Sequence, residues 1–353
     1  PPGSPGKEKS GAAGTSVLRI RALAILGDPP SWEAARLRDA MEDWATELSG
    51  RAREASSAGI EVWTRRISLP GLPGDDPSLV ARVSSASPDG VLVSIGHTRR
   101  PEVLEEAALQ GLYAYMPIQG PGDAAAAASA IVRIAGRDPE LATRVAVSAG
   151  GHIIATPYFP VSSAPPGRRI LAASILYASD VDASSVAGSV ASIFRRAEGA
   201  VPGAAFDYSL SPWMEDSVAA LVERAYGARV GSPGSMHAVH ELNRAIRRGA
   251  GPGALGFNEV MLPVEEDSAL KAMAREGSIR ASDLLRLSSV CVAGVDMAVV
   301  SAGPEEVRRF LLDARALSAS AGKPIGVRLI PVGDPPGTRV DLGRFGRATA
   351  IAL

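Results

Sequence analysis

The sequence predicts an α/β protein with a largely parallel sheet covered by helices, folded as a single large domain. Short apolar runs typical of buried strands alternate with segments in which apolar residues recur every three or four positions. Strands that alternate with helices in this way favour a parallel sheet. The length of 353 residues fits one large domain or two coupled units, and the lack of a convincing internal linker favours one.

The first half of the chain contains six strand candidates. Residues 17–26 (VLRIRALAIL) end at Gly27 and two prolines, and Ser31 can cap the helix that follows. The other expected strands are residues 60–69, 90–95, 112–118, 144–155 and 169–178. The expected helices are residues 32–58, 77–86, 101–110, 122–136 and 181–198.

The second half continues the alternation, which brings the count to about ten strand candidates. The expected strands are residues 204–210, 254–262, 294–301, 325–332 and a final one near 348–352. The expected helices are residues 214–227, 236–249, 266–276, 281–288 and 304–321. Between the halves, two prolines in the segment TPYFP (156–160) exclude a central strand. Tyr158 and Phe159 on this loop either line a pocket or fill the core, and general burial preferences favour the core.

Composition excludes several classes of function. With 37 basic and 38 acidic residues the net charge is −1, which disfavours nucleic acid and anionic membranes as partners. The single cysteine, Cys291, excludes an intrachain disulfide and a cysteine-based zinc site. No apolar run reaches the length of a membrane span. Residues 1–15 are rich in Pro, Gly and Ser and lack the apolar core of a signal peptide, so we expect a flexible tail and a cytoplasmic protein.

Two local patterns resemble binding motifs. His237 and His240 lie on one face of an expected helix beside Glu241, a spacing that can hold a metal. No third ligand is evident nearby, so we predict no metal site. The glycines of GAGPGALG (249–256) precede a strand, whereas Rossmann and P-loop glycines follow one. A flexible loop is the simpler interpretation, although close approach to a ligand also fits.

Charged residues inside apolar strands are harder to dismiss. Asp296 and Arg328 each lie in an apolar strand, where an unpaired charge is costly to bury. They pair with each other or belong to a ligand site.

Further acidic residues lie where expected strands end. Glu266 and Asp267 open a helix, which fits either charge complementarity with the helix dipole or a catalytic role at a strand end. Asp207 ends a strand beside Ser209 and Ser211, and these serines have no local base and no G-x-S-x-G elbow. A serine hydrolase is therefore unsupported.

Seven short motifs in order resemble one family, domain of unknown function 711, also called uncharacterised protein family 0210. They are FDYSLSPW, EDSVAALVE, GSPGS, LPVEEDSAL, SSVCVAGVDM, VRLIPVGDPPG and LGRFGRA. The resemblance covers residues 204–353 best and is thin over the first 140. It implies the ten-stranded α/β barrel of pyruvate formate-lyase and anaerobic ribonucleotide reductase, here spanning residues 16–353, and it implies self-association into a homo-oligomer.

The resemblance also selects polar residues for a site. The matching positions are Asp207, Ser209, Ser217, Glu266, Asp267, Cys291, Asp296, Arg328 and Arg347. In this hypothesis Arg328 and Arg347 bind a carboxylate or phosphate, with Ser209 and Asp267 as further binding residues. The catalytic candidates are the acids Asp207, Glu266 and Asp296, together with Cys291 as a nucleophile or a packing residue.

Two functions from different classes follow. The first is an enzyme that acts on a small anionic metabolite inside the barrel, and the second is a non-catalytic metabolite sensor with the same pocket. A radical enzyme would use Cys291 together with Gly343 or Gly346, but the chain lacks the usual arginine–valine–x–glycine–aromatic signature and is far shorter than those enzymes. The sequence specifies no cofactor.

Overall fold

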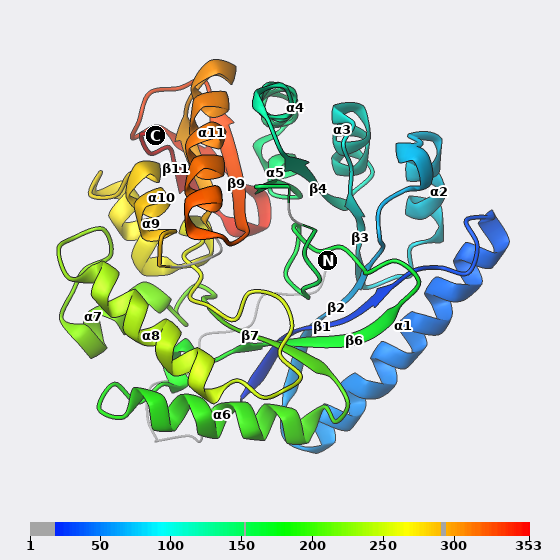
Figure 1. Ribbon diagram of the computed structural model, residues 1–353, viewed down its shortest axis with the longest axis horizontal. Coiled ribbons are helices and arrows are strands. Elements are labelled where there is room, and N and C mark those ends of the chain that lie inside the picture. Colours follow the sequence, from blue (N-terminus) through cyan, green and yellow to red (C-terminus); the bar gives the residue numbers. More distant parts are fainter. Residues whose placement is uncertain (1–17, 152, 291–293) are drawn as a thin grey trace.

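The protein is an α/β domain built on one large, mostly parallel sheet, as predicted (Figure 1). A computed structural model describes residues 18–151, 153–290 and 294–353. The expected tail at residues 1–15 and Cys291 lie outside these described residues. Among the helices that are described, none is long and apolar enough to cross a membrane.

Nine strands of the described residues form the main sheet, in the order β7-β6-β1-β2-β3-β4-β5-β9-β8. Strands β1 to β5 are parallel, and the pairs β6–β7 and β8–β9 run antiparallel to them. The strands are β1 (Arg19–Gly27), β2 (Glu61–Ser68), β3 (Val91–His97), β4 (Tyr113–Ile118), β5 (Val145–Ala149), β6 (Arg169–Leu176), β7 (Ala205–Ser211), β8 (Val295–Ser301) and β9 (Ile325–Val332).

The helices surround the curved sheet on its outer side (Figure 1). They are α1 (Ala34–Ser57), α2 (Ser78–Ala86), α3 (Pro101–Leu109), α4 (Pro121–Arg137), α5 (Pro139–Ala142), α6 (Val186–Ala200), α7 (Val218–Tyr226), α8 (Ser235–Gly249), α9 (Ser268–Arg275), α10 (Ala281–Leu287) and α11 (Pro304–Ala321). The largest core cluster is packed between these helices and the sheet.

Helix α1 illustrates how the sequence produces this packing. Leu37, Met41, Trp44 and Leu48 are spaced by four, three and four residues, so they form one stripe, and all four are buried. Each side chain of this size contributes about 1.5–3 kcal/mol by leaving water. A Cβ added to Gly27 would lie only 2.7 Å from the Trp44 ring. Glycine at the end of β1 therefore lets the helix pack closely against the strand.

The segment predicted as a strand at residues 254–262 is irregular, and that prediction is wrong. Gly256 and Asn258 have φ angles of 78° and 57°, which an extended strand does not allow. The segment makes only isolated parallel bridges, Phe206–Ala254 and Leu210–Val260 to β7 and Pro263–Asp296 to β8. Within the described residues the strands therefore form an open sheet with edges at β7 and β8, and not a continuous ten-stranded barrel.

The C-terminal region also differs from expectation. Instead of one final strand near 348–352, a hairpin forms from β10 (Arg339–Asp341) and β11 (Arg347–Thr349), with the 3₁₀ helix η4 (Gly343–Phe345) between them. Only Ile351 reaches the main sheet, as a bridge to Val300.

We expect Gly294→Ala to destabilise the protein by about 2–4 kcal/mol, because positive φ and overpacking both oppose a side chain there. Gly294 precedes β8 with φ of 70°, and its Cβ would lie 2.0 Å from the carbonyl oxygen of Gly326. Gly203→Ala is the matched control, because Gly203 has φ of 81° with nothing within 4 Å of an added methyl group. Denaturant unfolding measures both, and equal losses would contradict the close approach of β8 and β9.

Candidate functional site

A cavity of about 380 Å³ lies against the inner side of the sheet. Eight strands contribute to its wall, and the segments 158–161 and 257–263 together with η4 complete it. Its charged lining residues are Arg21, Arg66, Arg328, Arg344, Glu266 and Asp296. Four cations and two anions therefore line one cavity.

Aromatic residues are concentrated in this cavity. The chain has only 6 Phe, 4 Trp and 6 Tyr residues, and seven of these sixteen line it. They are Trp63, Tyr113, Tyr158, Phe159, Trp213, Phe257 and Phe345. The sequence left open whether Tyr158 and Phe159 line a pocket or fill the core. Both are buried and both line the cavity.

Strand periodicity explains why arginines point inward. Successive side chains of a strand face opposite sides of the sheet. In β2, Thr64 and Arg66 line the cavity, whereas Arg65 donates to Ser49 of α1 on the outer side. Trp63 also lines the cavity, so the alternation separates the two arginines and does not hold for every residue of β2. The same alternation leaves Arg66 only 8% exposed.

A buried chain of ion pairs crosses the cavity. Arg21 of β1 donates to Glu266, which ends the 3₁₀ helix η3 (Val264–Glu266). Arg328 of β9 donates to the other carboxylate oxygen of Glu266 at 3.0 Å. It also donates two hydrogen bonds, of 2.6 and 3.0 Å, to the carboxylate of Asp296 of β8. This Arg21–Glu266–Arg328–Asp296 chain neutralises both acids and connects β1 with β8 and β9.

The two carboxylates of the chain differ in acidity. Burial alone would raise the pKa of Glu266, but the Arg21 and Arg328 guanidiniums hold that pKa below its ordinary value. Burial raises the pKa of Asp296, and Arg328 opposes this shift only in part. Glu266 is therefore a permanent anion at neutral pH, and Asp296 is the more easily protonated of the two.

A β-bulge places Asp296. The register moves from Val295 opposite Val327 to Ala298 opposite Leu329, so β8 contains one residue more than β9 at this point. Met297 in the bulge has φ of 48°, which is unusual for a residue other than glycine. The bulge allows Asp296 to line the cavity while its neighbours Val295 and Met297 are fully buried in the core.

Arg66 has no carboxylate partner. It donates to the carbonyl oxygen of Pro157 at 3.0 Å and to Thr64 Oγ1 at 2.9 Å, and its guanidinium lies 5.2 Å from the Phe159 ring centre. Among the described residues no acid forms an ion pair with it. Burial and the nearby Arg21 cation lower the pKa of Arg66 to about 10, so it remains protonated at neutral pH.

Arg344 is the second cation of the cavity without an acid partner among the described residues. It is exposed on η4, donates to Tyr113 Oη at 2.9 Å and lies 4.7 Å from the Phe345 ring centre. The ammonium of Lys271 holds this turn from α9 by donating to the carbonyl oxygen of Phe345 at 2.6 Å. Lys271 is itself paired with the buried Glu265 at 3.3 Å.

Asp207 and Ser209 do not line the cavity. The Asp207 carboxylate is fully buried and accepts hydrogen bonds from Thr156 Oγ1 (2.7 Å) and Ser209 Oγ (2.6 Å). It also accepts from the backbone N–H groups of Ser209, Phe257 and Asn258. Burial raises the pKa of Asp207 in spite of these donors. These hydrogen bonds hold the irregular segment after α8 against β7.

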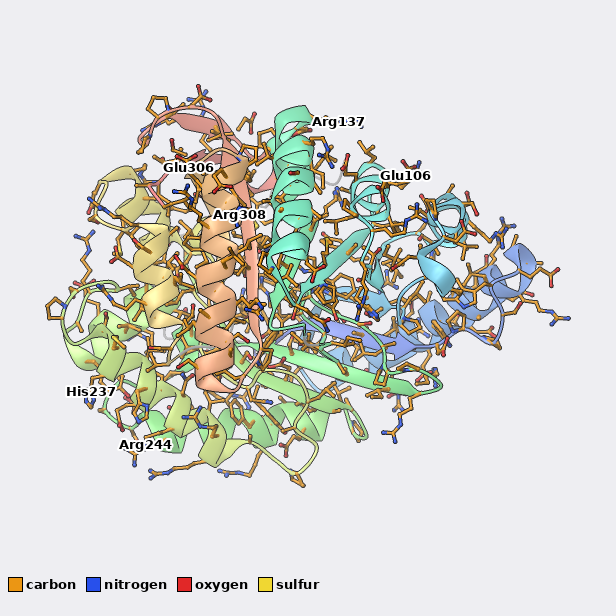
Figure 2. The ribbon with its side chains drawn as sticks, turned by 45° about the horizontal axis from the view of Figure 1, so that its top comes forward. Glu106, Arg137, His237, Arg244, Glu306 and Arg308 are labelled. Carbon is orange, nitrogen blue, oxygen red and sulfur yellow. The ribbon has the colours of Figure 1, made fainter. Side chains whose placement is uncertain are left out.

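The remaining sequence candidates are also dispersed. Asp267 caps α9 and accepts from Ser217 Oγ at 2.6 Å, away from the cavity lining. Arg347 is exposed on β11 and does not line the cavity either. His237 projects from the outer side of α8 (Figure 2). Of the described candidates, the structure brings together Glu266, Asp296 and Arg328.

Sequence reasoning missed Arg21, Arg66 and Arg344. Arg21 carries the signal that identified Arg328, a charge inside a mainly apolar strand, because it lies in VLRIRALAIL. Arg66 carries no such signal, because its strand EVWTRRIS contains three charged residues. Arg344 has no such signal, because its position depends on how the hairpin packs.

Fold and site together define an α/β protein with an aromatic, arginine-rich cavity on the inner side of its sheet. The chain belongs to the family described as "Uncharacterised ACR (DUF711)", whose model matches residues 138–342, more than half of the sequence. The family resemblance drawn from the seven motifs is thereby confirmed.

Named relatives support the same membership. A UPF0210 protein of Pyrobaculum arsenaticum is 38% identical over 148 residues, which is 40% of this chain and 33% of that protein. UPF0210 proteins of Pyrobaculum aerophilum and Lacticaseibacillus casei are 37% and 32% identical over 162 residues, or 43% of this chain, and 36% and 35% of those proteins. The chain therefore matches about a third of the length of these relatives.

Among solved structures, a dihydropteroate synthase from Thermus thermophilus in complex with 6HMPPP aligns over 90% of this chain and 88% of that chain. The TM-score is 0.19 and the sequence identity 16%. A similarity this low carries no argument about fold or function, and it gives no support to the pyruvate formate-lyase-like fold.

We expect Asp207→Asn to lower the free energy of unfolding by about 2–3 kcal/mol, because an amide cannot accept from all of the donors around it. Denaturant unfolding measures the loss. Asp182→Asn serves as control, because Asp182 is exposed and caps a turn that asparagine also caps, so little change is expected. Unchanged stability in Asp207→Asn would argue against this role of the Asp207 hydrogen bonds.

Arg328→Met should cost about 3–5 kcal/mol of stability, because it leaves Asp296 buried without its partner. The double variant Arg328→Met/Asp296→Leu should recover a large part of the loss, since Glu266 keeps Arg21. Arg347→Met, at an exposed site, should change the unfolding curve little. A double variant as unstable as the single one would mean that the pair does more than neutralise buried charge.

Proposed function

We propose that this protein binds a small metabolite carrying a carboxylate or phosphate group inside the cavity, with Arg66 as the principal anchor. The observation that carries the proposal is the charge imbalance. Glu266 and Asp296 neutralise Arg21 and Arg328, and the buried Arg66 has no acid partner among the described residues. Holding such a charge out of water is costly, and an anionic ligand would offset that cost.

The surroundings of Arg66 suit this task. Its contacts with Pro157 and Thr64 fix the plane of the guanidinium, so little side-chain entropy is lost on binding. The volume of about 380 Å³ is within the usual range of about 300–1,000 Å³ for small-molecule sites. The aromatic lining offers apolar surface to the body of the ligand.

This proposal reassigns the roles expected from the sequence. Arg328 is occupied by two acids, and Arg347 does not line the cavity, so Arg66 takes over as anion anchor. If the protein is an enzyme, Asp296 is the acid/base candidate we keep, because it lines the cavity with a raised pKa. A role for Cys291, including radical chemistry, stays a prediction, because Cys291 lies outside the described residues.

A non-catalytic sensor is the second candidate function. It is favoured by the fact that arginine engages both carboxylates in the cavity, which disfavours proton transfer by either. Incubation of the protein with a metabolite pool separates the two. An enzyme depletes a species that it binds, whereas a sensor returns every species unchanged.

We further propose that the irregular segment 254–263 completes a ten-membered ring between β7 and β8, resembling the pyruvate formate-lyase type of barrel. Its isolated bridges to both edge strands support this proposal. So does the arrangement of five parallel strands opposed by strands of the reverse direction. In such a ring the cavity would be enclosed on all sides.

Arg66→Gln tests the anchor. Without ligand we expect it to be as stable as the natural protein or more stable by about 1 kcal/mol, because an unpaired buried charge is removed while a donor remains. Thermal unfolding is then followed with inorganic phosphate, acetate, benzoate and phenyl phosphate. At least one should stabilise the natural protein through mass action, and none should stabilise Arg66→Gln.

Arg65→Gln is the matched control, because Arg65 is the neighbouring arginine on the outer face of β2. It should keep the full ligand response. If no anion of the panel stabilises the natural protein, or if Arg66→Gln responds as strongly, the proposed function is wrong.

A further inference from the structure

We infer that the ligand is a flat, conjugated dianion, with one anionic group at Arg66 and the other at Arg344. This inference rests on the proposed function and narrows its ligand class. It requires two separate anion anchors joined by a surface suited to a planar body. Each requirement has its own observation.

The first observation is the order of groups along one wall. The Arg66 guanidinium lies 5.2 Å from the Phe159 ring centre, and the Phe159 and Tyr113 rings lie 5.2 Å apart. Arg344 then donates to the hydroxyl of Tyr113 at 2.9 Å. Both guanidiniums therefore contact one aromatic pair, Arg66 at the Phe159 ring and Arg344 at the hydroxyl of Tyr113.

The second observation is the charge state of these two arginines. Each makes its contacts with neutral groups, and neither has an acid among its ion-pair partners in the described residues. A second anionic group would pair with Arg344, and charge-assisted hydrogen bonds to guanidinium forks are stronger than neutral ones.

The third observation is a second aromatic cluster lining the same cavity. Trp63 and Trp213 meet edge to face at 5.8 Å, and Trp213 and Phe345 lie 6.0 Å apart. Arg344 lies over Phe345, so this cluster reaches the same anchor as the first. Ring faces of this kind favour a planar, conjugated body over a flexible aliphatic one.

The size of the cavity limits the ligand further. A volume of about 380 Å³ is near the lower end of the range for small-molecule sites, about 300–1,000 Å³. It suits a single ring with two substituents and excludes a dinucleotide. Arg344 is exposed, so the second group binds at the more solvated end and contributes less than the group at Arg66.

Isothermal titration of the full chain with two matched probes tests the inference. Terephthalate has a carboxylate at each end of a benzene ring, and 4-carbamoylbenzoate has the same shape with one carboxylate replaced by a neutral amide. We expect terephthalate to bind about tenfold more tightly, as one further charge-assisted contact implies. Arg344→Gln should abolish the preference for terephthalate, and Arg66→Gln should weaken the binding of both probes.

Arg347→Gln controls for the loss of a positive charge on the same hairpin and should keep the tenfold preference, because Arg347 does not line the cavity. Equal binding of the two probes, or a preference that survives in Arg344→Gln, overturns the two-anchor inference. So does a failure of terephthalate to bind the natural protein. None of these results touches the proposed function, which stands or falls on the anion panel and Arg66→Gln.

Discussion

The architecture depends on how buried charge is neutralised on the inner side of the sheet. Arg328 holds two acids that come from different elements, Glu266 from η3 and Asp296 from β8, and Glu266 in turn holds Arg21 of β1. Buried ions are tolerated only when such partners are in place. These ion pairs fix η3 against strands that are distant in the sequence, and they leave Arg66 as the buried arginine of the cavity without an acid partner among the described residues.

Much of the fold was accessible from the sequence because apolar periodicity reports directly on which face of an element is buried. The strands β1 to β9 and the long helices α1, α4, α8 and α11 all lie where that pattern indicates. The pattern failed at residues 254–262, where apolar residues continue but the backbone does not. Positive φ angles at Gly256 and Asn258 break the strand there, and Gly256 leaves room for Asp207, whose oxygen would lie 2.1 Å from an added Cβ.

The site was predictable to a smaller extent, for a physical reason. A charge in an apolar strand signals a buried ion, so Asp296 and Arg328 stood out, but the same signal cannot separate an ion held by protein partners from one that awaits a ligand. Asp207 shows the limit, because its donors come from Thr156, Phe257 and Asn258, some fifty residues away on either side. Only three-dimensional contacts reveal that its carboxylate is already satisfied.

The turn between β10 and β11 lines the outer end of the cavity but is not part of the main sheet that holds the domain together. Arg344 and Phe345 reach the cavity from three residues of 3₁₀ helix, and the ammonium of Lys271 steadies that turn from outside. The inner end of the cavity is made by strands whose side chains also hold the domain together. If the cavity binds the ligand that we propose, substitutions in the turn would change its outer end without repacking the sheet.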